Sequence, residues 1–300
     1  MLEGDDCDQN GANDAHAHNQ LVIGYILSLQ EVLSSFVAEC FGVMRLDAVV
    51  AEQAGVTRST ARGLILAGRV RIDGTPATKA GTNVRDGAHV EIERPAPYVS
   101  RGGEKLEHAL EEFSVDPAGK NALDIGASTG GFTDCLLSKN ALHVTAVDVG
   151  YGQLAWRLRN DPRVTVMERT NFRHLPPDAF PKHFEIIVID TSFISLRKIV
   201  DRARHDLAEG GSIVALVKPQ FEAGRERLGS GGVVRDPQVH RAILREVQSA
   251  MNNLGLRVNG VVASPLLGPA GNREFLMLLR ADGSEVGEDR IDAVVAGEQQ

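Results

Sequence analysis

The sequence predicts an α/β fold with a parallel sheet, preceded by a small α+β unit and an acidic N-terminal arm. Seven short apolar runs alternate with helical stretches beyond residue 99, a different helix and strand pattern fills residues 44–94, and residues 1–43 lack both patterns. Alternating strands and helices are typical of a parallel sheet covered by helices. The length of 300 residues fits about two domains.

The composition narrows the class of protein. With 43% hydrophobic and 24% charged residues, the chain is close to soluble globular averages, which excludes disordered, collagen-like and polytopic membrane proteins. The three cysteines, Cys7, Cys40 and Cys135, have no metal-ligand spacing. We therefore expect no disulfide framework, no metal site and a cytoplasmic location.

The arm of residues 1–43 holds seven acidic residues and no Lys or Arg, so most of the net charge of -8 lies there. The rest of the chain is near neutral, and a local basic face on it is sufficient for binding nucleic acid. The apolar run in the arm ends near Leu29, too short for the ~20 residues that span a bilayer. We expect no membrane partner.

Met44 immediately precedes a helical pattern. Two interpretations of the arm stay open. In one, translation starts at Met44 and residues 44–300 are the working protein. In the other, residues 1–43 are a regulatory arm.

The unit at 44–94 has helical spacing from Leu46, a stop at Gly55, and Thr57 placed to cap a second helix. Two short strands are predicted next, at 70–72 and 89–92. The second helix and first strand are rich in arginine, and we expect four side chains to converge on one surface suited to phosphates: Arg58, Arg62, Arg69 and Arg71. The alternative is an ordinary solvated face.

The large domain is predicted to contain seven strands, at 122–126, 144–148, 164–168, 186–190, 213–218, 260–263 and 275–279. Ligands bind at the carboxyl ends of parallel strands. The first strand ends in a glycine-rich loop with Gly126, Ser128 and Gly130, and the second ends at Asp148, where a carboxylate can accept hydrogen bonds from ribose hydroxyls. The loop lacks the second glycine of a dinucleotide motif, which favours S-adenosylmethionine.

The same loop matches a second motif, the nucleophile elbow Gly-x-Ser-x-Gly of α/β-hydrolases, with Asp190 and either His205 or His240 in the right chain order. An elbow normally follows the middle strands of its sheet. Here the match follows the first strand of the domain. We therefore disfavour a hydrolase.

Four further polar residues lie at the ends of predicted elements. Asp190 and Lys218 end strands, Lys105 begins the first helix of the domain, and Glu274 begins the last strand. Burial and nearby cations favour the neutral amine of a lysine, which is then able to accept a proton. An ordinary surface lysine is the alternative for Lys218.

Several motifs resemble known families. The segment RLDAVVAEQAGVTRSTARGLILAGRVRIDG resembles the S4 RNA-binding domain. The motifs SRGGEKL, LDIGASTGGFTD, DTSFISL, LVKPQFE, GGVVRDP and SPLLGPAGNREF, in that order, resemble the TlyA family, often labelled hemolysin A. Members of that family join an S4 domain to an FtsJ-type methyltransferase, and the resemblance extends from Met44 to about Arg280.

The resemblance implies a Rossmann-like class I S-adenosylmethionine-dependent domain at 99–282, after the S4 domain at 44–94 and a linker at 95–98. It implies 2'-O-methylation of cytidine in ribosomal RNA or ribosomal subunits, with S-adenosyl-L-methionine as cofactor. The implied catalytic residues are Lys105, Asp190, Lys218 and Glu274. The implied cofactor residues are Gly126, Ser128, Gly130, Phe132 and Asp148.

In this scheme Lys218, neutralised by proximity to Lys105, is the base, and Lys105 orients the hydroxyl. We expect 23S rRNA as a target and leave 16S rRNA open, because a basic leader is lacking while the tail at 283–300 retains a predicted helix at 288–296. The alternatives are a non-catalytic rRNA-binding or ribosome assembly factor and, with less support, a lytic protein.

Three aromatic residues and one loop have less defined expectations. Phe193 either stacks on the target base or packs in the core. Tyr151 and Trp156, which lie beside the second predicted strand, are expected to pack rather than to contact the cofactor. The loop at 222–235 is glycine-rich, a composition suited to a mobile segment that orders over RNA.

Overall fold

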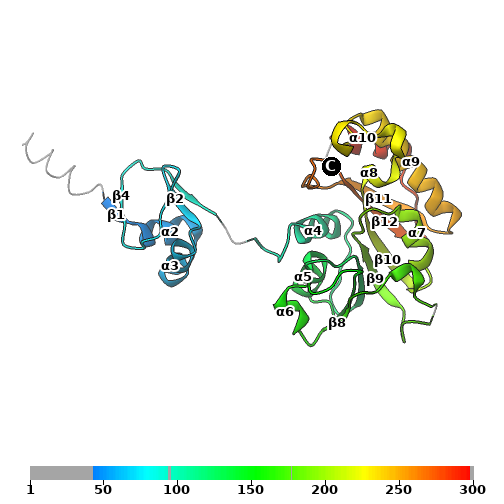
Figure 1. Cartoon of the computed structure of the whole chain (residues 1–300), viewed down its shortest axis with the longest axis horizontal. Helices are drawn as coiled ribbons and strands as arrows, with labels where there is room; N and C mark the ends of the chain where they lie inside the picture. The colour runs from blue at the N-terminus through cyan, green and yellow to red at the C-terminus, as the bar shows by residue number, and fades with distance from the viewer. Residues whose placement is uncertain (1–42, 94–95, 177, 298–300) are drawn as a thin grey trace, which may run out of the picture. The chain divides into compact units, whose positions relative to one another are not determined.

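The computed structural model describes residues 43–93, 96–176 and 178–297. The arm predicted at 1–43 therefore lies outside the described residues except for Val43, as does the first residue of the linker predicted at 95–98. The chain divides into two compact units, one before residue 96 and the other from Ala96 onward. Each unit is described by itself (Figure 1).

The small unit packs two helices against short strands. Its helices are α2 (Leu46–Ala54) and α3 (Arg58–Leu66). Strands β3 (Thr75–Pro76), β2 (Val70–Ile72) and β5 (Val90–Ile92) form one antiparallel sheet, and β1 (Val43–Arg45) pairs with β4 (Asn83–Arg85). The Thr57 hydroxyl accepts the Thr60 N–H at the start of α3, as predicted for its cap.

The large unit is built on seven strands: β6 (Asn121–Ile125), β7 (His143–Val147), β8 (Val164–Met167), β9 (Phe184–Ile189), β10 (Leu207–Val217), β11 (Arg257–Ala263) and β12 (Phe275–Arg280). Their order in the sheet is β11-β12-β10-β9-β6-β7-β8. The first strand, β6, therefore lies between β7 and β9. Strand order reverses at the β6–β9 boundary, which is where ligands bind in open α/β sheets.

Helices cover both faces of this sheet (Figure 1). The helices are α4 (Gly102–Glu112), α5 (Gly131–Ser138), α6 (Trp156–Arg159), α7 (Leu196–Ala203), α8 (Pro219–Glu222), α9 (Pro237–Asn253) and α10 (Glu288–Ala296). Single 3₁₀ turns occur at η1 (Phe172–His174), η2 (Arg225–Arg227) and η3 (Ser230–Gly232). One hydrophobic cluster lies beneath α4, α5 and α6, and another beneath α7, α9 and α10.

All seven predicted strands are present, but the prediction of a parallel sheet was wrong at one end. Strand β12 runs antiparallel to both β10 and β11. The segment between β11 and β12 contains no helix, and a return without a helical crossover places two strands antiparallel. The α/β class is unaffected, because β6 to β10 remain parallel.

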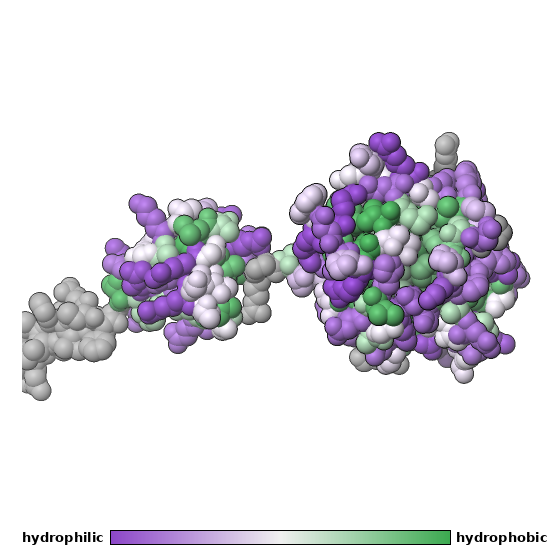
Figure 2. Space-filling model, turned by 90° about the horizontal axis from the view of Figure 1, so that it is seen from below, coloured by the Kyte–Doolittle hydropathy of each residue, from purple (hydrophilic) through white to green (hydrophobic). Residues whose placement is uncertain are grey.

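The visible surface of each unit combines hydrophilic side chains with patches of hydrophobic ones, and the more extensive patches lie on the large unit (Figure 2). In the part of the chain that the structure describes, no helix is long and apolar enough to cross a membrane.

Candidate active site

Four parallel strands bring predicted site residues to one edge of the sheet. Each strand ends one residue before such a residue. Gly126 follows β6, Asp148 follows β7, Asp190 follows β9 and Lys218 follows β10. Two cavities of similar size open at this edge. The predicted residues therefore meet where the topology directs them.

The first cavity has a volume of about 480 Å³, which is within the usual range for small-molecule sites. Its walls come from the ends of β6, β7 and β9 and from η1. The residues that line it include Gly126, Ser128, Asp148, Gln153, Asn171, Phe172, Asp190, Ser192 and Phe193.

The glycine-rich loop and Asp148 form the rim of the first cavity. Gly126 has a φ of +87°, and a Cβ built on it would lie 2.5 Å from the carbonyl oxygen of Asp190, so a side chain at this position is excluded. The Asp148 carboxylate accepts the backbone N–H of Ser128 at 2.8 Å and of Gly150 at 2.6 Å. Each of its oxygens keeps a lone pair for a ligand hydroxyl.

Gly130 and Phe132 do not line the first cavity. Gly130 caps the start of α5 with a φ of +98°, and a Cβ on it would collide with Leu158. Phe132 is 3% exposed and lines the second cavity. Gly130 therefore shapes the glycine-rich loop, and Phe132 forms part of the wall of the second cavity.

The second cavity has a volume of about 470 Å³ and shares Gly126, Ser128, Asp190 and Ser192 with the first. Lys105, Lys218, Phe132, Arg101 and Leu267 are among its other lining residues. A ligand in the first cavity and a second molecule in this one would meet at the four shared residues.

The four predicted catalytic residues form two lysine–carboxylate pairs. Lys105 Nζ donates a hydrogen bond to Glu274 Oε2 at 2.5 Å, with side chains 9% and 1% exposed. Lys218 Nζ lies 2.6 Å from Asp190 Oδ1, with side chains 12% and 25% exposed. Glu274 is therefore behind Lys105, outside the cavity lining.

The sequence did not indicate Ser192, whose hydroxyl accepts a hydrogen bond from Lys218 Nζ at 2.9 Å. It also did not indicate Asn171 and Phe172, which line the first cavity. Applying the strand-end rule to β8 would have pointed toward the segment of η1. No comparable rule identifies a hydroxyl in the middle of a loop.

Asp124 is a buried acid directly beneath this site. It is 0% exposed on β6 and accepts the Thr133 hydroxyl at 2.7 Å through Oδ2. Its Oδ1 has no hydrogen-bond partner among the residues described. Burial, together with the nearby charges of Asp190 and Asp148, raises the pKa of Asp124 to about 7.

Comparison with known proteins identifies the family. The FtsJ-like methyltransferase family matches residues 98–281, and the S4 domain matches residues 44–90. A Mycobacterium tuberculosis protein named "16S/23S rRNA (cytidine-2'-O)-methyltransferase TlyA" is 48% identical over 240 residues, which cover 79% of this chain and 89% of that protein.

The chain belongs to the TlyA family of FtsJ-like methyltransferases.

Other members of the family carry other names. "Hemolysin A" of Brachyspira hyodysenteriae is 41% identical, with 78% of this chain and 98% of that protein covered. A solved structure named "Putative hemolysin from Streptococcus thermophilus" is 41% identical, has a TM-score of 0.66, and matches over 86% of this chain and 96% of its own. The predicted family and fold class are therefore confirmed.

The S4 unit of this TlyA-family chain bears the four predicted arginines. Arg58, Arg62 and Arg71 are exposed, whereas Arg69 is half-buried. Arg69 directly precedes β2, after the turn at Ala67 and Gly68, and Arg71 lies within that strand.

One of these arginines already forms an ion pair within the unit. The Asp47 carboxylate, 1% exposed, pairs with Arg62 Nε at 3.2 Å and with Arg45 at 2.9 Å. These two guanidinium groups hold the pKa of Asp47 well below its usual range. Arg62 is therefore fixed in position and partly neutralised.

Tyr151 and Trp156, which were expected to pack, are instead 67% and 78% exposed. Arg169 covers one face of the Tyr151 ring, with its guanidinium carbon 4.1 Å from the ring centroid. Phe193 is 90% exposed beside the first cavity. Of the two interpretations of Phe193, the structure excludes core packing.

Proposed function

We propose that the protein transfers a methyl group from S-adenosylmethionine to the ribose 2'-hydroxyl of a cytidine in ribosomal RNA. The observation that carries the proposal is the junction of the two cavities, where Asp190 and Ser192 are shared and Lys105 and Lys218 line one side. The name of the M. tuberculosis relative supports the reaction and the RNA class. The exposed arginines of the S4 unit support RNA binding.

The first cavity fits S-adenosylmethionine. Asp148 would accept hydrogen bonds from the ribose of the cofactor, Gly126 and Ser128 would lie against its amino-acid part, and Phe172 offers an apolar wall. The bound cofactor supplies an electrophilic methyl group. We propose Gly130 and Phe132 as residues that shape this loop rather than contact the cofactor.

The second cavity would receive the target nucleotide. Lys105 donates a hydrogen bond to Glu274 and lines this cavity, where its ammonium group would orient the 2'-hydroxyl. Lys218 would take the proton from this hydroxyl. Asp190, 2.6 Å away, would then stabilise the resulting ammonium.

One detail of the sequence-based scheme changes. Proximity to Lys105 was expected to keep Lys218 neutral, but Glu274 balances the charge of Lys105 at 2.5 Å. The scheme therefore relies on the exclusion of water when RNA covers the site rather than on repulsion between the two lysines.

The test is the transfer of tritiated methyl groups from S-adenosylmethionine to 16S and 23S rRNA, isolated subunits and 70S ribosomes. We expect label on 23S rRNA or 50S subunits, mapping to a cytidine 2'-oxygen, and the same assay shows whether 30S subunits are a target. Cofactor binding without transfer to any of these RNAs would refute the proposal and favour a binding or assembly role.

A further inference from the structure

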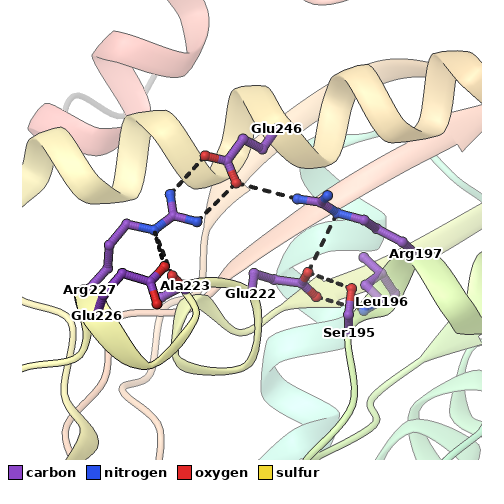
Figure 3. Close-up of polar contacts among 8 residues, drawn as sticks. All are labelled: Ser195, Leu196, Arg197, Glu222, Ala223, Glu226, Arg227 and Glu246. Atoms are coloured by element: carbon purple, nitrogen blue, oxygen red, sulfur yellow. Dashed lines mark hydrogen bonds and ion pairs between the residues drawn. The ribbon is translucent and has the colours of Figure 1, made fainter.

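The chain segments that carry Lys218 and Asp190 are joined a second time, away from their own ion pair. Helix α8 follows Lys218 and ends at Glu222. The Glu222 carboxylate accepts the backbone N–H of Leu196 at 2.6 Å and the hydroxyl of Ser195 at 2.7 Å (Figure 3). Ser195 and Leu196 begin α7, on the segment that follows Asp190.

Glu222 is a buried group with defined partners. Its side chain is 3% exposed, and burial raises the pKa of its carboxyl above the ordinary range. Arg197 Nε lies 3.8 Å from Oε2. Hydrogen bonds to a carboxylate are short and directional, so this group fixes the start of α7 against the end of α8.

The loop between Asp190 and Ser195 needs such a fixed end. It contains Ser192, the acceptor for Lys218, and Phe193, which has a φ of +63°. A non-glycine residue in the left-handed region persists when the surrounding structure imposes it. The Phe193 ring also contacts that of Phe221, with centroids 5.1 Å apart, so the two segments meet along their length.

A second set of contacts ties the same region to α9 without touching this loop. Glu246 on α9 accepts hydrogen bonds from Arg227 at 2.7 and 3.1 Å and from Arg197 at 3.4 Å (Figure 3). Arg227 also donates to the carbonyl of Ala223 at 2.6 Å. The glycine-rich segment at 222–235 is therefore anchored at its beginning.

We infer that Glu222 is a positioning residue for methyl transfer, which holds the Lys218 segment and the Asp190–Ser192 loop in register. The inference rests on the proposed function. It assigns to Glu222 no contact with substrate or cofactor. Glu222 would affect the methyl-transfer rate by fixing the positions of Lys218, Asp190 and Ser192 relative to one another. A misplacement of about 1 Å in a catalytic site can cost roughly 100-fold in rate.

The test compares Glu222→Ala, Glu222→Gln and Ser195→Ala with Glu246→Ala as the matched control from the same network. Single-turnover methyl transfer is measured with saturating tritiated S-adenosylmethionine and isolated 50S subunits. We expect Glu222→Ala to lose about 10- to 100-fold in rate. Glu222→Gln should retain most of the rate, because its amide oxygen can accept from Leu196 and its amide nitrogen can donate to Ser195.

Ser195→Ala removes one of the two hydrogen bonds that Glu222 accepts and keeps the carboxylate. This variant therefore still tests the inference if Glu222→Ala does not fold. It should lose a few-fold in rate, and Glu246→Ala should stay near the wild-type rate. Because the Asp190–Ser192 loop also lines the first cavity, the affinity for S-adenosylmethionine is measured in parallel, and the saturating cofactor keeps any change in that affinity out of the single-turnover rate. The pH at half-maximal rate should shift in Glu222→Ala, because the environment of Lys218 changes, and stay in place in Glu246→Ala.

Two results would overturn the inference. One is a wild-type rate and pH profile in folded Glu222→Ala or, if that variant does not fold, in Ser195→Ala. The other is an equal loss in Glu222→Ala and Glu246→Ala with unchanged pH profiles, which would indicate a general loss of stability. If wild-type protein methylates no RNA, the proposed function itself fails, and the inference fails with it. An active wild type separates the two cases.

Discussion

The two lysine–carboxylate pairs of the active site differ mainly in their acids. Glu274 is 1% exposed behind Lys105, whereas Asp190 is 25% exposed beside Lys218 and lines both cavities. We call Lys105–Glu274 the closed pair and Lys218–Asp190 the open pair. The closed pair keeps both of its charges in place, because removing one partner would leave the other charge buried and unpaired. An open pair can exchange a proton with a bound molecule. The comparison supports our proposal that Lys105 orients the hydroxyl and Lys218 accepts its proton.

The largest effect should come from the open pair. Lys218→Ala removes the proposed base and should lower the methyl-transfer rate by about 10²- to 10⁴-fold, with little change in cofactor affinity. The measurement is tritium transfer to 50S subunits, with cofactor binding followed by calorimetry. A Lys218→Ala protein with more than a tenth of the wild-type rate would break the assignment of proton transfer to this pair.

The closed pair should dominate stability instead. Lys105→Met leaves Glu274 buried without its partner, which should cost about 3–5 kcal/mol in the free energy of unfolding. The double variant Lys105→Met/Glu274→Leu should recover much of this loss. Urea unfolding of the single and double variants measures both values.

Lys218→Met is the control for that experiment. It leaves Asp190 partly in water, so it should cost about 1 kcal/mol or less. Equal losses in Lys105→Met and Lys218→Met would remove the distinction between a closed and an open pair.

The pKa of Asp124, which lies beneath the open pair, should make the stability of the protein depend on pH. Its pKa, about 7 in the folded protein, exceeds that of an aspartate in an unfolded chain. At a pH between these two pKa values, Asp124 is therefore protonated in the folded state and ionised in the unfolded state. Wild-type stability should therefore fall as pH rises toward 7, by up to about 1.4 kcal/mol per unit from this group. Asp124→Asn should lack this part of the slope.

Urea unfolding of wild-type and Asp124→Asn protein between pH 5 and 8 checks this prediction. The stability of the variant relative to wild type should increase with pH up to about 7 and then level off. A difference that stays constant with pH would mean that Asp124 is ionised throughout.

The smallest effect should come from Ser192→Ala, which deletes the hydroxyl that accepts from Lys218. The loss of one such hydrogen bond is about 1 kcal/mol, or roughly fivefold in rate. Ser138→Ala, at an exposed position of α5, is the control. A loss as large as that of Lys218→Ala would show that Ser192 takes part in proton transfer itself.

Much of the site could be predicted from the sequence, since a residue that ends a parallel strand has a known destination. Asp148, Asp190 and Lys218 reach the same edge for that reason alone. The pairing of Lys105 with Glu274 could not be predicted from local pattern, because it joins residues far apart in the chain through the antiparallel insertion of β12. The exposure of Trp156 was missed because periodicity describes spacing and not the neighbours a side chain finds.

The position of β12 also determines when the sheet can be completed during synthesis. This strand is next to last among the elements of the chain, yet it lies inside the sheet between β10 and β11, and it brings Glu274 to Lys105. During synthesis the sheet remains incomplete until this segment has left the ribosome. The Lys105–Glu274 pair can therefore form only after β12 has been made, although Lys105 itself precedes every strand of this sheet in the chain.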